Sequence, residues 1–133
     1  MGPLFAVPRR LMQKKPPHGQ PCTRCGVCCI ASVCPVGAAV ISQTAGPCPV
    51  LRFDGDESSC GLVAEPMKYR PVATVAFGRE AMAEAARHLI GSATGCDARF
   101  NGEPADDAFY AALDEHDRKT AAQTRRARAM WGV

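Results

Sequence analysis

Apolar residues repeat at helical spacing over about residues 75–90 of the chain. Met82, Ala86 and Leu89 stand at positions i, i+4 and i+7, which share one face of a helix. Gly91 follows them, at a place where glycine commonly ends a helix. The pattern therefore predicts an amphipathic helix over about 75–90.

A second helix is predicted over about residues 105–130. Asp106–Asp107 favour its start and a basic cluster favours its end, because these charges complement the helix dipole. Phe109 and Leu113 form an apolar stripe in its first half, which fades into alanine and threonine in the second. We therefore expect the last turns to project from the body, with Trp131 placed either to anchor them or to meet a partner.

The first half of the chain has weaker patterns. Val50–Phe53 is followed by Asp54-Gly55, which predicts a short strand entering a tight hairpin turn. Residues 1–21 contain five prolines, which remove backbone donors and fix φ. We expect this segment to be an extended arm rather than a helix. Residues 22–62 are rich in glycine and proline and would form an unstable loop unless something organised them.

Composition supplies a reason for that organisation. Of the 133 residues, 47% are hydrophobic but only 6% are aromatic, so a core of small side chains buries little area per residue. The chain has eight cysteines, and seven of them lie between positions 22 and 60. We treat all eight as candidate metal ligands: Cys22, Cys25, Cys28, Cys29, Cys34, Cys48, Cys60 and Cys96.

Disulfides are the competing explanation for so many cysteines. A disulfide framework is typical of secreted chains, yet the first ten residues lack the uninterrupted apolar stretch of a signal peptide. No stretch approaches the roughly 20 apolar residues of a membrane span. We therefore expect a cytoplasmic protein with reduced thiols, or a virion-associated one, and metal binding rather than disulfides.

The spacing Cys22-x2-Cys25-x2-Cys28 can turn three thiols toward one centre, as ferredoxin-type loops do around a [4Fe–4S] cluster. Gly26 lets the backbone approach the sulfurs. Five residues separate Cys28 from Cys34-Pro35, however, so a standard ferredoxin repeat is excluded. An iron–sulfur cluster, most simply [4Fe–4S], is the predicted cofactor.

Zinc is the alternative cofactor. It takes four thiolates, usually from two C-x2-C pairs, and only one clean pair starts here, although eight cysteines could fill two sites. Cys28 and Cys29 are adjacent, and neighbouring side chains diverge in an extended segment. Either Cys29 is a buried bystander or the two serve different centres. Cys96 lies just past the first predicted helix, from which it could return to the cluster.

Three other residues bear on the ligand set. Cys48, between two prolines, and Cys60, before Gly61, have loop surroundings suited to ligands. His88 stands four residues after Glu84 and is expected to form a surface pair with it rather than to bind metal.

The order Cys22-x2-Cys25-x2-Cys28-Cys29, followed by Cys48-Pro-Val-Leu and Cys60-Gly-Leu, resembles the CxxCxxCC (YkgJ-type) family of zinc- or iron-chelating domains in bacteria and phages. The likeness covers about 40 to 50 residues. It implies metal chelation but no settled activity. In that family a further cysteine usually follows an Arg-Pro pair by three residues, whereas here Thr74 follows Arg70-Pro71. Cys34 or Cys96 would have to take its place.

No phosphate-binding loop, nucleophile elbow or HExxH motif is present, so the sequence predicts no enzyme activity. We expect a non-catalytic iron–sulfur protein with a structural, electron-transfer or redox-sensing role. The alternatives are a zinc-stapled interaction module, such as a phage or virion component, and, from the resemblance alone, an accessory domain of an enzyme.

The net charge of +3 is mild, but basic residues gather at both ends of the chain. A protein is the expected partner and nucleic acid the alternative, with no role for a membrane. The basic residues are Arg9, Arg10, Lys14 and Lys15 in the arm, and Arg118, Lys119, Arg125, Arg126 and Arg128 near the C-terminus.

The predicted fold is thus a small, irregular, metal-stapled α+β domain: a cysteine-rich loop region with a short β-hairpin, followed by two α-helices. Its predicted organisation has three parts. Residues 1–21 are an extended proline-rich and basic arm, and residues 22–100 a cysteine-cluster domain with one helix. Residues 101–133 hold the C-terminal helix with its basic end.

Overall fold

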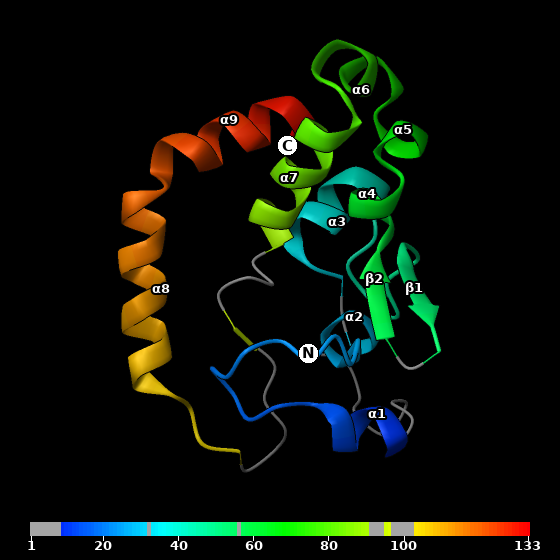
Figure 1. Ribbon diagram of the computed structural model, residues 1–133. Coiled ribbons are helices and arrows are strands. Elements are labelled where there is room, and N and C mark those ends of the chain that lie inside the picture. Colours follow the sequence, from blue (N-terminus) through cyan, green and yellow to red (C-terminus); the bar gives the residue numbers. More distant parts are fainter. Residues whose placement is uncertain (1–8, 32, 56, 91–94, 97–102) are drawn as a thin grey trace.

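The structure is a computed structural model that describes residues 9–31, 33–55, 57–90, 95–96 and 103–133. It has the predicted class, a small α+β domain with one two-stranded antiparallel sheet and several helices. None of the helices in these ranges is both long and apolar enough to cross a membrane. In chain order (Figure 1) the elements are α1 (Arg9–Lys14), α2 (Val27–Ala31), α3 (Pro35–Ile41), β1 (Leu51–Asp54), β2 (Glu57–Cys60), α4 (Gly61–Ala64), α5 (Pro66–Tyr69), α6 (Pro71–Phe77), α7 (Arg79–Ile90), α8 (Asp107–Lys119) and α9 (Ala121–Trp131).

The predicted hairpin is confirmed. Strands β1 and β2 pair antiparallel, with Leu51 opposite Cys60 and Asp54 opposite Glu57 at the turn. The Gly61 N–H then donates to the Val50 carbonyl at 2.8 Å, which ties the start of α4 to the entrance of the hairpin. The hairpin thereby brings the residues before β1 close to the end of β2.

The predicted helix over about 75–90 is two helices rather than one. Helices α6 and α7 are separated by Gly78, which has φ 93° and ψ 150°. This conformation is accessible almost only to glycine, because a Cβ would clash with the backbone. Gly78 thus ends α6 and lets α7 leave in a new direction.

The predicted helix over about 105–130 is also divided. Helix α8 ends at Lys119, and its C-cap residue Thr120, with φ −105° and ψ 14°, separates it from α9. Figure 1 shows α8 standing along one side of the molecule, while α9 crosses over to reach α7. The break allows the end of the chain to pack on the core instead of projecting from it.

The main core lies where α9 crosses α7. Trp131, Met82 and Leu62 are completely buried there, together with Ala86. The Trp131 indole Nε1 donates a 3.0 Å hydrogen bond to the Met82 carbonyl. Of the two roles that the sequence left open for Trp131, the structure shows the anchor. Small alanines on α7 allow the tryptophan to approach closely, so one aromatic residue fills much of this core.

The expectation of an extended N-terminal arm is wrong for Arg9–Lys14, which form helix α1, whereas residues 15–21 are not helical. Residues 1–8 lie outside the described ranges. Leu11 of α1 is 2% exposed and packs with Cys25 and Val27 in a second, smaller apolar cluster. A single buried leucine therefore explains why this helix docks on the domain.

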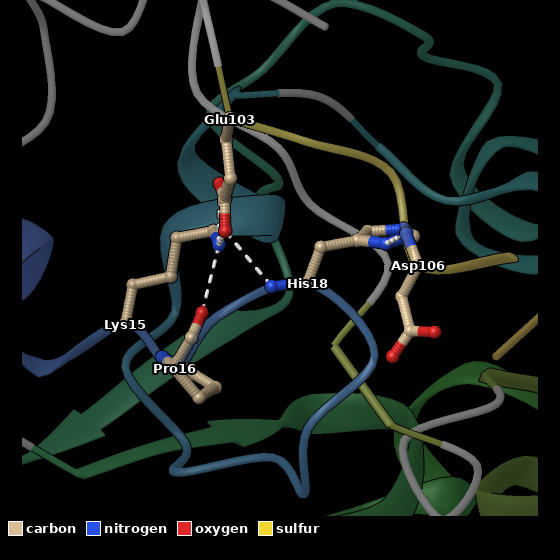
Figure 2. A network of polar contacts seen from close by, with 5 residues as sticks. All are labelled: Lys15, Pro16, His18, Glu103 and Asp106. Atoms are coloured by element: carbon tan, nitrogen blue, oxygen red, sulfur yellow. Dashed lines mark hydrogen bonds and ion pairs between the residues drawn. The ribbon is translucent and has the colours of Figure 1, made fainter. Parts of the chain in front are cut away.

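Polar contacts hold the segment after α1 (Figure 2). The Lys15 ammonium, buried to 1% exposure, pairs with Glu103 at 3.0 Å, and Glu103 also accepts from the His18 backbone N–H at 2.8 Å. The Asp106 N–H donates to His18 Nδ1 at 3.1 Å, which places the imidazole against the start of α8. These contacts fasten the chain just before Cys22 to the C-terminal third of the protein.

Candidate metal centre

Five of the eight cysteines come together beside the main core. They reach it from four short segments: α2, the start of α3, the loop before β1 and the end of β2. Cys48 is buried in that core, and three half-buried cysteines pack against it. The five, which we call the thiol cluster, are Cys28, Cys29, Cys34, Cys48 and Cys60.

Cys28 and Cys29 form the outer side of the thiol cluster. Their Sγ atoms lie 4.0 Å apart and form a sulfur–sulfur hydrogen bond. The expectation that these side chains diverge is wrong, because it assumed an extended segment and both residues lie in helix α2. Adjacent cysteines are therefore able to act at one site in this protein.

Backbone contacts place the other members of the cluster. The Cys48 N–H donates to the Cys29 carbonyl at 2.7 Å, which joins the loop before β1 to α2. At Gly37, an added Cβ would lie 3.4 Å from the Cys34 Sγ and 3.9 Å from the Cys48 Sγ. These two sulfurs thus face the same small space, which the absence of a side chain at Gly37 keeps open.

Cys34 and Cys60 occupy matching positions, since each is the N-cap residue of a short helix. The Gly37 N–H in the first turn of α3 donates to the Cys34 Sγ at 3.4 Å. Helix α3 was not expected, although Cys34-Pro35 carried a signal for it, because proline is favoured at the first position of a helix. Backbone N–H groups near a sulfur stabilise its thiolate form, which is the form that binds metal.

The thiols also interact electrostatically. The hydrogen bond with Cys28 is the largest of the causes that raise the pKa of Cys29, followed by burial and by the charges of Cys28, Cys48 and Cys60. Burial raises the pKa of Cys34 and, separately, that of Cys60. The charge of Cys48 adds to both effects, while nearby backbone N–H groups oppose them. Several thiolates in this space repel one another, and a cation would relieve that repulsion.

The sulfur atoms of the thiol cluster are not arranged as the ligands of a bound metal ion. Among the residues that the structure describes, no group of three or more His, Cys, Asp or Glu side chains is arranged to hold a metal ion. No disulfide joins any of the eight cysteines, all of which are described. Binding an ion would therefore require rotation of the cysteine side chains toward one point.

The remaining three candidate ligands have different surroundings. Cys22 is exposed, and its Sγ accepts from the Arg24 N–H at 3.3 Å. Cys25 is buried in the small apolar cluster with Leu11. The backbone of Cys96 forms two hydrogen bonds of 2.8 Å: its carbonyl accepts from the Gly19 N–H, and its N–H donates to the Gln20 carbonyl. That the first three cysteines of the motif share one centre remains a prediction.

His88 and Thr74 were the other two positions considered in connection with the metal site. His88 does not pair with Glu84, because its Nε2 lies 2.7 Å from Thr124 Oγ1 while Glu84 pairs with Arg87. Thr74, which stands where the CxxCxxCC family has a cysteine, is 3% exposed and donates its hydroxyl to the Arg70 carbonyl at 2.6 Å. Thr74 thus serves helix α6 locally.

No protein-family model matches this chain, and neither a curated protein nor a solved structure matches it significantly. The resemblance to the CxxCxxCC family accordingly depends on the cysteine spacing alone, and any function must be argued from the thiol cluster itself.

Proposed function

We propose that this protein binds a metal through the thiol cluster and uses it as a non-catalytic, structural centre. The observation that supports this most is the approach of Cys28, Cys29, Cys34, Cys48 and Cys60 from four separate segments. Burial and neighbouring thiols raise the pKa values of Cys29, Cys34 and Cys60, and a bound cation would both displace the protons and compensate the charge.

Zinc is the occupant that the geometry supports best. Thiolates on one zinc ion, at Zn–S distances of about 2.3 Å, lie about 3.8 Å apart along a tetrahedron edge. The Cys28–Cys29 separation of 4.0 Å is close to that value. In a [4Fe–4S] cluster each cysteine binds a different iron, so the ligand sulfurs are farther apart. The Cys22-x2-Cys25-x2-Cys28 spacing still favours the iron–sulfur cluster, which is the second candidate.

A structural role follows from the size of the linked elements. Helix α2 has five residues, α3 has seven, and each strand has four. Isolated elements of this length are unstable in water, and helices shorter than about 12 residues are marginal alone. One ion bound by their cysteines would join α2, α3 and the hairpin, and its binding energy would contribute to folding.

Metal, iron and sulfide analysis of anaerobically purified protein tests the proposal. We expect about one zinc per chain, lost on Cys48→Ser and kept on Cys96→Ser, which is the matched control because Cys96 lies by Gly19 and Gln20. Brown protein with about four irons per chain and acid-labile sulfide would show that the cofactor is the iron–sulfur cluster and not zinc. Protein without metal after growth in zinc and iron, and with no affinity for added Zn²⁺, would overturn metal binding altogether.

A further inference from the structure

Helix α9 carries a cationic surface that the metal proposal does not use. Arg125, Arg126 and Arg128 are all exposed on it. The opposite face of the helix is buried on α7 through Ala127, and on the main core through Trp131. We call the three arginines the α9 arginine face.

These arginines differ from the basic residues near the ends of α7 and α8. Arg87 on α7 pairs with Glu84, and both Arg118 and Lys119 on α8 pair with Glu115. No ion pair is formed by an arginine of the α9 arginine face within the described ranges. The sequence explains the difference, because no acidic residue stands three or four positions from any of the three.

The helix dipole explains only part of this charge. Arg128 lies in the last turn of α9, where a cation is stabilising, but Arg125 and Arg126 lie in the turn before. Arg125 and Arg128 are also three positions apart, and like charges at this spacing cost about 0.2–0.5 kcal/mol. The helix dipole thus accounts for Arg128 alone and leaves Arg125 and Arg126 available to an anionic partner.

The arrangement suits the phosphates of a duplex. With 3.6 residues per turn, Arg126 and Arg128 lie about 160° apart around the helix axis, on either side of Arg125. A helix that enters the major groove of B-form DNA, about 12 Å wide, has phosphates on both sides of it. Guanidinium groups bind phosphate oxygens in pairs, so the two outer arginines can each meet one strand.

The exposed residues beside the α9 arginine face are small or polar. Ala121, Ala122, Gln123 and Ala129 are exposed on the same helix, and none is a large apolar or aromatic side chain. A membrane-binding helix needs large apolar residues to insert, and the energetic centres of protein interfaces usually combine arginine with tryptophan or tyrosine. Small side chains instead let a helix approach a groove closely. Figure 1 shows α9 along an edge of the molecule, with α7 on its inner side.

We propose that the α9 arginine face binds double-stranded DNA through its phosphates, without sequence preference. This activity is independent of the thiol cluster, so failure of one proposal leaves the other standing. Three phosphate contacts give a slope of log K against log salt of about −2.7, which is about a 40-fold loss of affinity between 50 and 200 mM salt.

The experiment is fluorescence anisotropy of a labelled 20-base-pair duplex with the full-length protein. The test variant is R125Q/R126Q/R128Q, and the control variant R87Q/R118Q/K119Q removes the same charge from paired positions on α7 and α8. We expect the test variant to lose at least tenfold in affinity and most of the salt slope, and the control to stay within about threefold of the native protein. Circular dichroism of both variants checks their folding.

Four results would overturn the proposal. The first is no binding by the native protein at 50 mM salt, where non-specific phosphate contacts are strong. The second is an equal loss in both triple variants, which would make the effect one of net charge. The third is tighter binding of single-stranded DNA or RNA than of the duplex, which would show that binding does not depend on the major groove. The fourth is binding of polyglutamate but not of duplex, which would indicate an acidic protein as the partner.

Discussion

The indole of Trp131 donates to the carbonyl of Met82 at 3.0 Å, with both side chains completely buried. This bond joins the last turn of α9 to the first turns of α7, across 49 residues of sequence. The same end of the chain is held a second time, because the Arg70 Nε donates to the Trp131 carbonyl at 2.8 Å. The tryptophan therefore fixes where α9 lies and, with it, which face of α9 is exposed.

Replacing this tryptophan should separate its two contributions. Trp131→Ala should lower the free energy of unfolding by about 3–5 kcal/mol, because it leaves a cavity in the core. Trp131→Phe keeps most of the apolar contact and loses the hydrogen bond, so we expect it to lower the free energy of unfolding by only about 1 kcal/mol. Urea denaturation followed by circular dichroism measures both. The control is Phe77→Ala, at a side chain that is 50% exposed; an equal loss there would contradict the anchoring role.

Gly78 should be required for its conformation rather than for its size. No atom outside Gly78 and its two chain neighbours lies within 4 Å of a Cβ built there, yet φ 93° with ψ 150° is nearly closed to other residues because of their own local backbone. Both Gly78→Ala and Gly78→Asn should therefore destabilise the protein by about 1–3 kcal/mol.

Gly132 is the matched control for that prediction. It has φ 69° and ψ 36°, a left-handed conformation that asparagine tolerates. Gly132→Asn should thus cost less than Gly78→Asn in the same denaturation experiment. Equal costs at the two positions would show that the glycine at 78 is not needed for the turn between α6 and α7.

Alkaline pH should weaken the metal-free protein. In the folded state the pKa values of Cys29, Cys34 and Cys60 are raised above the ordinary thiol value of 9.0, mainly by the Cys28 hydrogen bond in the first and by burial in the others. Above about pH 9 the unfolded chain therefore binds fewer protons than the folded one, so stability must fall as pH rises. Below pH 9 this contribution is fully present.

Denaturation of the chelator-treated, reduced protein at pH 7, 9 and 10.5 checks this expectation. The control is Cys34→Ser/Cys60→Ser, which removes two of the three titrating thiols and should flatten the pH dependence above 9. If this variant loses stability as steeply as the native chain, the thiol cluster is not the cause of the pH dependence. Protein loaded with metal should resist alkali better, because its thiolates are already formed and bound.

Local sequence signals predicted the class of fold and several of its elements. The hairpin at β1 and β2 follows from Asp54-Gly55 after an apolar run, since turn chemistry acts over four residues. The charges of Asp106 and Asp107 also indicated a helix start at about residue 105, close to the observed start of α8 at Asp107. The N-cap hydrogen bond that Asp106 forms was seen only in the structure. Such features depend on neighbours in sequence and are visible without the fold.

The breaks in the helices depend on contacts across the chain. Residues around Thr120 are all compatible with a helix, so nothing local ends α8 there. The chain turns because Trp131 and Met130 gain burial only by lying on the core around α7. Gly78 was a visible candidate for a break, yet a glycine alone does not decide between a tolerated residue and a turn.

For the cysteines, too, the sequence determined one part of the result and the tertiary structure the other. Their number and spacing in the sequence predicted a thiol-rich site, because seven cysteines within 39 positions of one another have few other uses. Which of them meet was decided by the tertiary structure: helix α2 brought Cys28 and Cys29 to 4.0 Å, and the hairpin brought Cys60 back toward Cys48. Spacing in sequence limits how far apart two thiols can be, whereas only the packing of the elements between them determines that they face each other.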